Sequence, residues 1–529
     1  MLRRVTFLPR NVTVEVEDGE SMVKAATAAG VGLELPCAGQ GVCGRCKVSV
    51  SGCTSEDGKE KLRPIEWEAG VRLACISSVM GDCTIMVTSP VEQGISATVD
   101  HSPLRDHPYS PLSDKGFGIA VDIGTTTVAA SLFDLKDGRE VKSLSDYNHQ
   151  VLYGEDVLSR MEFAEEGGTE ALRGLVLKTI NGMLANMKEA LNGKMVMALT
   201  VAANTVMGHL FLGVDPSPLR HPPHLPLVSG TRVDMKSSGL EINPKAEVLV
   251  IPPLSSYVGG DVVADVIHSG MHTDPRLTLL IDVGTNGEVV LGNNEFLIAC
   301  SSSAGPAFEG GEVECGSRAC PGAVEGVRVE DGDFHLKVIN DCDPESFCGS
   351  GLIDLVAQMF QAGILDKNGR FSGTTGLRDD DGSPRFHIPG KEGLSISEKE
   401  VQSIMRTKAA IFAASRTLLR NLGMDFQDLD RVLIAGGFGR HIDLENAISI
   451  GLLPDLPREL FEFIGNAALG GAKSVLLSAD AREEMENLAP RMTYLDLSND
   501  ASFFHEYSSA LFLPHTDEEL FPSSRTGRL

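Results

Sequence analysis

A short motif occurs twice in this chain, and the two copies constrain the possible folds more than any other feature. FGIAVDIGTTTVAAS spans residues 117–131, and LTLLIDVGTNGEVVL spans residues 277–291. Each copy is an apolar run, then Asp-x-Gly-Thr, then a second apolar run, and such runs bounded by glycine are typical of buried β-strands. The Asp-x-Gly-Thr segment predicts a tight hairpin turn between the two strands. Two copies indicate a duplicated domain whose hairpins face one cleft.

The residues at the two turns favour phosphate and magnesium chemistry. Gly124 and Gly284 leave the backbone open, so that a phosphate can approach main-chain N–H groups. Asp122 and Asp282 stand near the strand ends, where a carboxylate can hold Mg²⁺ or its waters. The residues expected to hold the phosphates with these glycines are Thr125, Thr126, Thr127, Thr285, Asn286 and Gly287.

A third glycine-rich turn follows later in the chain. VLIAGGFGRHI, residues 432–442, is an apolar strand that runs into glycines. Two phosphate hairpins followed by this loop, together with KMVMALTVAANTVMGHLF at 194–211, resemble the superfamily of acetate kinase, sugar kinases, heat-shock chaperones and actin. The resemblance covers roughly residues 116–500 and implies a duplicated RNase H-like fold that binds ATP. It places Gly436, Gly437, Phe438 and Gly439 at the adenosine.

Two further positions are candidates for the same cleft. Val258-Gly259-Gly260-Asp261 opens a helix, which would bring Asp261 close to the nucleotide. The alternative is an ordinary acidic residue in the first turn of a helix, where the helix dipole favours it. Gly305 lies in SSSAGPAFEGGEVECGS, whose glycines and serines suggest a loop that lines a site.

Four cysteines near the N-terminus predict a [2Fe–2S] cluster. Cys37, Cys43 and Cys46 lie in a glycine-rich loop with the spacing C-x5-C-x2-C, and Cys75 follows after 28 intervening residues. Two irons need four thiolates, and a glycine-rich loop can wrap around the cluster. Structural zinc is the alternative, although zinc sites usually use two C-x2-C pairs. The spacing resembles that of adrenodoxin-like and corrinoid-activator ferredoxin domains.

The remaining cysteines give no second metal site. Their spacings fit no common ligand pattern, and the sequence leaves open the role of Cys315, Cys320, Cys342 and Cys348.

The chain divides into five segments on these grounds. The 529 residues are too many for one core. Residues 91–115 are rich in proline and polar residues, as is typical of a mobile linker, and the alternative is a loop packed against the next domain. The last segment carries aromatic residues, and part of it is expected to dock on the body. The predicted segments are a β-grasp ferredoxin-like domain at 1–90, the linker at 91–115, two RNase H-like halves at 116–275 and 276–500, and a tail at 501–529.

Composition excludes several classes of partner. A formal net charge of −27 argues against nucleic acid, which attracts clustered Lys and Arg. MLRRVTFLPR lacks the apolar core of a signal peptide. The most apolar window, 195–214, contains Asn204, Thr205 and His209, which favours a buried strand and helix over a membrane span. Eleven cysteines without a secretion signal indicate a reducing cytoplasm.

An iron–sulfur unit, a linker and an actin-like ATPase in one chain resemble the reductive activators of corrinoid proteins. GPAFEG, CGSGLIDL and IAGGFGRHI belong to the same resemblance. It implies that one electron passes from the [2Fe–2S] cluster to Co(II) in a partner's corrinoid, regenerating Co(I) for methyl transfer while ATP drives the step. It further implies Mg²⁺, a low-potential electron donor and a homodimer. Asp122, Asp261 and Asp282 are then the expected catalytic residues.

Two other functions remain open at this stage. One is a small-molecule kinase with a redox-sensing ferredoxin domain, although no sugar- or acid-binding signature is visible. The other is an electron-transfer module that binds nucleotide without hydrolysing it. The activators of radical dehydratases share the ATPase fold but lack the N-terminal ferredoxin unit, which argues against that class.

Overall fold

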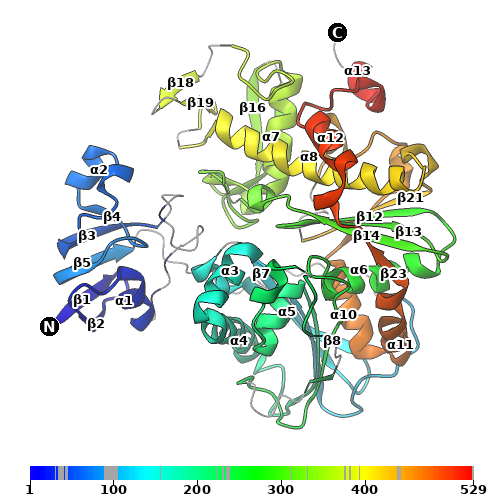
Figure 1. Cartoon of the computed structure of the whole chain (residues 1–529), viewed down its shortest axis with the longest axis horizontal. Helices are drawn as coiled ribbons and strands as arrows, with labels where there is room; N and C mark the ends of the chain where they lie inside the picture. Colours follow the sequence, from blue (N-terminus) through cyan, green and yellow to red (C-terminus); the bar gives the residue numbers. More distant parts are fainter. Residues whose placement is uncertain are drawn as a thin grey trace.

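The structure is a computed structural model of the chain, with an N-terminal unit beside a larger body (Figure 1). It describes residues 1–29, 31, 33, 41, 46–87, 105–154, 156–222, 224–228, 232–233, 239–310, 312–330, 332–373, 377–380, 383–391, 393–437 and 442–526.

The N-terminal unit is a β-grasp domain, as predicted. Its five-stranded sheet has the order β2-β1-β5-β3-β4, in which β1 pairs parallel with β5 and antiparallel with β2. Apolar residues of α1, including Met22 and Ala25, are fully buried against it. Ser21 caps this helix by accepting a hydrogen bond from the Lys24 N–H. The elements are β1 Leu2–Leu8, β2 Val12–Glu17, α1 Met22–Ala28, β3 Lys47–Thr54, α2 Pro64–Glu68, β4 Val71–Leu73 and β5 Val79–Val87.

Two six-stranded sheets form the body, and five strands of each follow the same order, which confirms the duplication; the sixth strand differs, because β10 lies beside β11 in the first sheet and β23 lies beside β14 in the second. The first has the order β10-β11-β9-β6-β7-β8, and the second has the order β22-β21-β12-β13-β14-β23. In each, the strand of the Asp-x-Gly-Thr motif pairs antiparallel with the next strand and parallel with a later one. The strands of the first sheet are β6 Phe117–Ile123, β7 Thr127–Asp134, β8 Arg139–Tyr147, β9 Val196–Ala203, β10 Arg232–Val233 and β11 Glu247–Val250. Those of the second are β12 Thr278–Val283, β13 Gly287–Gly292, β14 Leu297–Ser302, β21 Arg431–Ala435, β22 Phe461–Gly465 and β23 Met492–Tyr494.

Helices pack against both sheets, and two of them join the halves. The helices of the first half are α3 Val157–Phe163, α4 Thr169–Met187, α5 Thr205–Leu212 and α6 Gly260–Ser269. Those of the second half are α8 Glu398–Asn421, α9 Leu444–Ser449, α10 Ala467–Leu477 and α11 Ala479–Leu488. α6 lies against α10, where a Cβ atom on Gly471 would stand 2.2 Å from the Ala264 carbonyl oxygen. Small residues in α10 therefore let the two helices approach closely.

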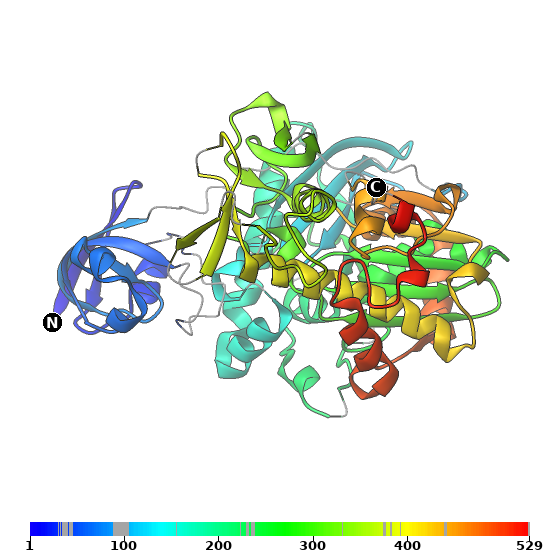
Figure 2. The same cartoon turned by 90° about the horizontal axis from the view of Figure 1, so that it is seen from above.

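An insertion between β14 and α8 forms a separate lobe, which Figure 2 shows from above. It packs in the same hydrophobic core as the second half. Its elements are β15 Ala323–Glu330, β16 Asp333–Val338, β17 Ser346–Phe347, α7 Gly349–Gln361, β18 Leu377–Asp380, β19 Ser383–His387 and β20 Ser395–Ser397. The predicted capping box is present, because Ser397 and Glu400 exchange hydrogen bonds at the start of α8.

The second part of the predicted linker is not a free spacer. Backbone hydrogen bonds join Ser110 to Leu477 and Leu112 to Leu476. Arg105 and His107 both donate to the Glu484 carboxylate, at 3.1 and 3.2 Å. The proline-rich composition does not distinguish a mobile linker from this docked segment, because a few apolar and charged side chains are enough to hold an extended segment. Residues 88–104 lie outside the described part of the chain.

The C-terminal tail docks on the body, as expected. α12 Ala501–Ala510 packs on α8, and a short α13 follows at Ser523–Thr526. Glu506 is buried and pairs with Arg416 at 2.7 Å. The buried Lys408 ammonium donates to the Phe512 and Pro514 carbonyls at 2.5 and 2.6 Å.

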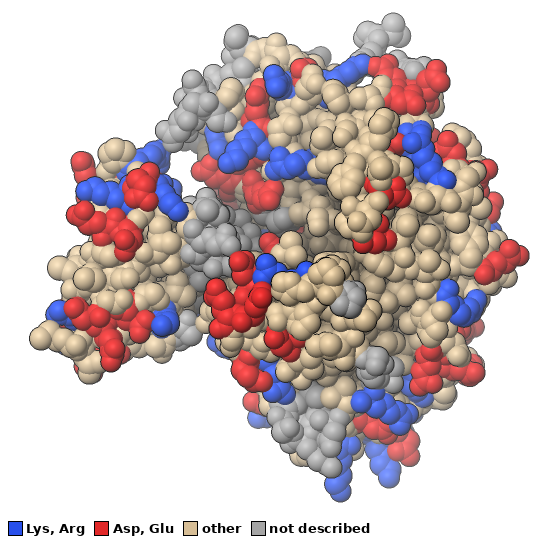
Figure 3. Space-filling model, in the orientation of Figure 1, with Lys and Arg blue, Asp and Glu red and all other residues tan. Residues whose placement is uncertain are grey.

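The surface in Figure 3 interleaves acidic and basic side chains, and the face shown carries no continuous basic patch among the described residues. None of the described helices has the length and apolar content needed to cross a bilayer.

Candidate nucleotide and iron–sulfur sites

The two Asp-x-Gly-Thr hairpins meet in the cleft between the halves. The Thr126 and Thr285 hydroxyl oxygens lie 3.1 Å apart, although the residues are far apart in sequence. Each hydroxyl comes from one hairpin, and both point to the same place. The two hairpins therefore lie together, as the duplicated motif predicted.

The shape of the first hairpin depends on glycine and on buried polar partners. The Gly124 N–H donates to the Thr127 carbonyl at 2.9 Å, and a Cβ atom on Gly124 would lie 2.7 Å from that oxygen. The buried Arg160 guanidinium donates to the Thr125 carbonyl at 2.5 Å. Asn148 donates to the Gly124 carbonyl at 2.9 Å. The Thr125 and Gly124 carbonyls thus accept hydrogen bonds from side chains outside the loop, which fixes the orientation of its peptide groups.

The second hairpin is closed by a hydrogen bond from the Gly284 N–H to the Asn286 carbonyl at 3.1 Å. Gly287 also has a packing reason to be glycine. It is buried in β13, and a Cβ atom there would stand 2.6 Å from the Ile411 side chain of α8. Close packing of α8 explains this glycine without a phosphate.

Three carboxylates named from the sequence gather beside the hairpins. Burial, together with the neighbouring Asp261 carboxylate, raises the pKa of Asp122 and of Asp282 to about 7. Burial also raises the pKa of Asp261 to about 6. Asp261 does lie in the first turn of α6, but it belongs to this cluster as well. A cleft of buried acids with raised pKa values is an electrostatically unstable site that a cation would stabilise.

Three residues of the cluster were missed by sequence analysis. Asp265, one turn after Asp261 on α6, is fully buried, and burial together with the neighbouring Asp282 and Asp261 carboxylates raises its pKa well above the ordinary range. Glu288 stands opposite Asp282 in the β12–β13 pair, and burial raises its pKa well above the ordinary range. Asn466, the N-cap of α10, donates to Asp122 at 2.9 Å. The i, i+4 spacing of the two α6 aspartates was a usable signal.

Glu309 is a further residue that the sequence analysis did not single out. Its carboxylate oxygen accepts hydrogen bonds from Thr126 at 2.7 Å and from Thr285 at 2.5 Å. It stands at the end of a 3-10 turn, Pro306–Glu309, which follows Gly305. Gly305 has a φ of 84° and so shapes the loop that delivers Glu309 to the hairpins.

The third glycine turn reaches the same cluster. Gly436 has a φ of 107°, and a Cβ atom there would lie 2.4 Å from the Val283 carbonyl and 3.0 Å from the Asp282 carboxylate. At Gly437, by contrast, no described atom lies within 4 Å of that position, so its surface is open. Phe438 and Gly439 lie outside the described residues.

The donor set fits Mg²⁺ in its usual mode of binding. In proteins this ion is commonly held by one or two carboxylates together with waters and substrate phosphates. Within the described ranges, no group of three or more His, Cys, Asp or Glu side chains is arranged to hold a metal by itself. Asp122 and Asp282 therefore match a site that the nucleotide completes.

Two of the four predicted cluster ligands are described, and they meet. The Cys46 and Cys75 sulfurs lie 3.1 Å apart, although 28 residues separate them in the chain. The hydrogen bond with Cys75 lowers the pKa of the Cys46 thiol to about 7, which favours the thiolate that metals bind. Cys37 and Cys43 lie outside the described residues. The observed pair fits ligation of one iron.

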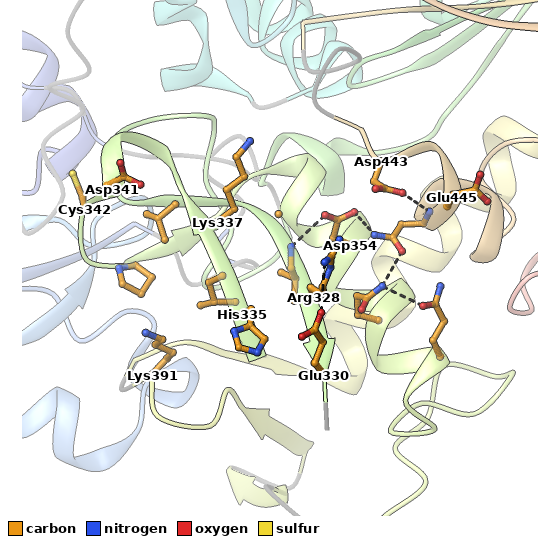
Figure 4. A pocket seen from close by; sticks show the side chains of 18 of the residues that line it. Arg328, Glu330, His335, Lys337, Asp341, Cys342, Asp354, Lys391, Asp443 and Glu445 are labelled. Carbon is orange, nitrogen blue, oxygen red and sulfur yellow. Dashed lines mark hydrogen bonds and ion pairs between the residues drawn. The ribbon is translucent and has the colours of Figure 1, made fainter. Parts of the chain in front are cut away.

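A separate open cavity of about 1090 Å³ lies between the β15–β16 pair, α7 and the start of α9 (Figure 4). On its wall Asp354 accepts hydrogen bonds from the Asn446 side chain at 2.7 Å and the Val327 N–H at 3.2 Å. The Gln358 side chain donates to the side-chain amide oxygen of Asn446, Oδ1, at 3.0 Å. These polar groups satisfy one another and join α7 to α9.

Three sequence families match the three units of the chain. Residues 5–80 match a 2Fe-2S iron-sulfur cluster binding domain, and residues 117–274 match the RACo middle region. Residues 276–525 match the C-terminal domain of RACo, described as the ASKHA domain. The fold classes predicted for both parts of the chain are thereby confirmed.

Three known proteins are similar to this chain over most of its length. The corrinoid activation enzyme RamQ of Eubacterium limosum is 34% identical over 415 residues, which cover 74% of this chain and 69% of that protein. The [Co(II) methylated amine-specific corrinoid protein] reductase of Methanosarcina barkeri is 24% identical over 410 residues, covering 71% and 73%. The solved structure of a reductive activator for corrinoid, iron-sulfur protein has 32% sequence identity and a TM-score of 0.73, covering 98% of this chain and 100% of that chain. The chain therefore belongs to the family of reductive activators of corrinoid proteins.

Proposed function

We propose that this protein reductively activates the corrinoid protein of a methyltransferase system in an ATP-dependent reaction. The names of the relatives support a corrinoid protein as the partner. When bound at Cys37, Cys43, Cys46 and Cys75, a [2Fe–2S] cluster supplies one-electron transfer. The proposed acceptor is Co(II) of the partner's corrinoid, which gains one electron and becomes Co(I). A low-potential donor returns that electron to the protein.

The observation that carries the ATP requirement is the meeting of the two hairpins. Hydroxyls of Thr126 and Thr285 lie 3.1 Å apart beside the half-buried carboxylates of Asp122 and Asp282. Phosphoryl transfer needs phosphate-positioning donors, a metal ion and an oriented water, and little covalent chemistry from the protein. In this proposal the two aspartates and Asp261 organise Mg²⁺ and water, and the hairpin hydroxyls and N–H groups hold the phosphates.

The adenosine is proposed to lie against the open backbone at Gly437. Gly436 is already packed on Asp282, so the strand delivers the adenosine loop next to the phosphates. The remaining residues of that loop, Phe438 and Gly439, are assigned to the adenosine by the resemblance alone.

ATP can assist the uphill reduction only if the nucleotide has different affinities for two arrangements of the protein. A nucleotide that binds one arrangement of the two halves more tightly shifts the equilibrium between arrangements by that difference. If the partner with Co(II) and the partner with Co(I) prefer different arrangements, nucleotide turnover releases the reduced partner. The same proposal includes a homodimer, which sedimentation analysis of the purified protein would test.

The decisive experiment is a spectroscopic assay of cobalt. The reduced protein is mixed with a corrinoid protein held as Co(II), with and without Mg-ATP, and the Co(I) absorption band is followed. The expected result is Co(I) only when ATP is present. A kinase with a redox sensor would give no Co(I) but would phosphorylate a metabolite, and a non-hydrolysing module would give Co(I) without releasing phosphate. The Asp122→Asn variant is the control for nucleotide turnover.

A further inference from the structure

The carboxylate of Glu309 occupies the point where the two phosphate hairpins meet. One of its oxygens accepts hydrogen bonds from the Thr126 hydroxyl at 2.7 Å and the Thr285 hydroxyl at 2.5 Å. The three groups form a closed triangle, because the two hydroxyl oxygens are 3.1 Å apart. One hydroxyl belongs to each half of the protein, so Glu309 bridges both halves.

An ionised carboxylate resembles a phosphate oxygen in the property that matters here. Both are anionic acceptors that donate nothing, and both take short hydrogen bonds from hydroxyl groups. The two hydroxyls that Glu309 satisfies are donors that nucleotide phosphates would need in the proposed function. A hydroxyl has one proton to donate, so it cannot serve Glu309 and a phosphate at the same time.

The loop that carries Glu309 is anchored to other elements. Gly305 and Gly310 flank the turn with φ values of 84° and 81°. Phe308 is buried, and the start of α7 is so close that a Cβ atom on Gly349 would lie 2.1 Å from its carbonyl. Movement of Glu309 away from the hairpins would therefore disturb the close packing of Phe308 against the start of α7.

A second contact from the insertion holds the first hairpin. The Arg318 guanidinium donates to the Thr126 carbonyl at 2.5 Å and stacks 3.4 Å from the centre of the Tyr147 ring. Thr126 is thus held by Glu309 through its side chain and by Arg318 through its backbone. Both contacts cross from the second half to the first.

We propose that Glu309 is an internal occupant of the phosphate site, which the phosphates of a nucleoside triphosphate must displace. The inference rests on the proposed function, because it assumes that the hairpins bind phosphates. Displacement removes the Glu309 contact that holds Thr126 to the second half and leaves the Arg318 contact. Glu309 is therefore a positioning residue that links phosphate occupancy to the contact between the halves.

The test compares nucleotide affinity in three variants of the full chain. Titration calorimetry measures the Kd of a non-hydrolysable ATP analogue with Mg²⁺ for wild type, Glu309→Ala, Glu309→Gln and the control Glu312→Gln. Glu312 is exposed and three residues away, so its substitution removes one nearby charge without touching the hairpins.

The expected result is a Kd about fivefold lower for Glu309→Ala, because the competing acceptor is gone. Glu309→Gln keeps an acceptor but loses the charge, so its Kd should fall about twofold. The Glu312→Gln variant should match wild type. Circular dichroism checks that each variant folds, and the near-isosteric Glu309→Gln decides the question if Glu309→Ala does not fold.

Three results would overturn the inference. An unchanged or higher Kd in both Glu309 variants would show that the carboxylate does not compete with nucleotide. An unchanged Kd with slower hydrolysis would instead make Glu309 a residue that orients water. A wild-type protein that binds no nucleotide would end the inference together with the ATP part of the proposed function, whereas wild-type binding without tightening in the variants would end the inference alone.

Discussion

At the scale of single residues, the acidic cluster determines the behaviour of the cleft. Asp122 accepts a hydrogen bond from the Asn466 side chain at 2.9 Å. Its carboxylate lies with Asp261 and Asp282 in a buried place that a divalent cation would neutralise. The charge at this position, rather than its shape, is what the proposed chemistry requires.

Asp122→Asn should therefore abolish Mg-dependent ATP hydrolysis, with a loss of about 100-fold or more, because an amide cannot replace the charge. The visible spectrum of the cluster should be unchanged, because Cys46 and Cys75 belong to another core. Phosphate release and absorption spectra check both expectations. Turnover at the wild-type rate would remove Asp122 from the site.

The same acids predict how the stability of the nucleotide-free protein depends on pH. Burial raises the pKa of Asp122 and Asp282 to about 7 from the ordinary 3.8, so the folded state binds protons that the unfolded state has released. The stabilisation is fully present below about pH 4 for these groups and is lost as pH rises through about 7.

Between pH 5 and pH 8 the melting temperature should fall, with at least about 1.4 kcal/mol of stability lost, the equivalent of one pKa unit. Differential scanning fluorimetry would measure it. Asp282→Asn should flatten the profile, and Mg-ATP should stabilise more at pH 8 than at pH 5. A melting temperature that rises over this interval in the wild type would contradict the assignment.

At the scale of elements, the α6–α10 contact joins the two halves through close backbone packing. Gly471 of α10 lies against the α6 backbone at Ala264, where a Cβ atom would stand 2.2 Å from a carbonyl oxygen. Backbone atoms cannot move aside as a flexible side chain can. The contact therefore depends on glycine at this position.

Gly471→Ala should destabilise the protein by about 2 kcal/mol or more, because the helices must separate. The matched control is Gly174→Ala in α4, where no described atom lies within 4 Å of the added methyl group. That change should stabilise by about 0.5–1 kcal/mol through helix propensity. Urea denaturation of both variants tests the pair, and equal effects would refute the close-contact explanation.

At the scale of the whole molecule, the chain consists of parts with separate cores joined by a partly docked segment. The N-terminal unit has its own hydrophobic cluster, which includes Val5, Phe7 and Ile85. The second part of the linker is held at Glu484, whose carboxylate is contacted by Arg105, His107 and His272. Although burial opposes it, hydrogen bonding from His272 and the neighbouring charges lower the pKa of Glu484 to about 2.

Cys46→Ser should remove the cluster absorption and leave nucleotide affinity unchanged, because the ligand lies in the separate N-terminal core. Absorption spectra and titration calorimetry measure the two properties. A change in nucleotide affinity by more than about twofold would show that the two units communicate through the loss of the cluster.

Glu484→Gln should loosen residues 105–112 from α11. The variant loses the charge that attracts Arg105 and keeps the helix intact, so the effect should be local. Limited proteolysis should cut this segment about five times faster than in the wild type, since opening costs about 1 kcal/mol less. Asp480→Asn, in the first turn of the same helix, is the control and should be cut at the wild-type rate.

The sequence by itself determined the parts of this protein that depend on local pattern. The repeated Asp-x-Gly-Thr turns predicted the duplicated sheets, and the capping box at Ser397 predicted the start of α8. Cys46 and Cys75 were predicted to meet across 28 residues, and they do. Such features are readable because apolar periodicity, turn residues and ligand spacing act over short distances along the chain.

Only the tertiary structure decided which distant side chains share the cleft. Asp265, Glu288, Glu309 and Asn466 carry no motif of their own, and Gly287 carries a motif but serves the packing of α8. Their roles follow from contacts between elements that are far apart in sequence. The free energy of burying and pairing a charge depends on those neighbours in space, which the order of residues does not specify.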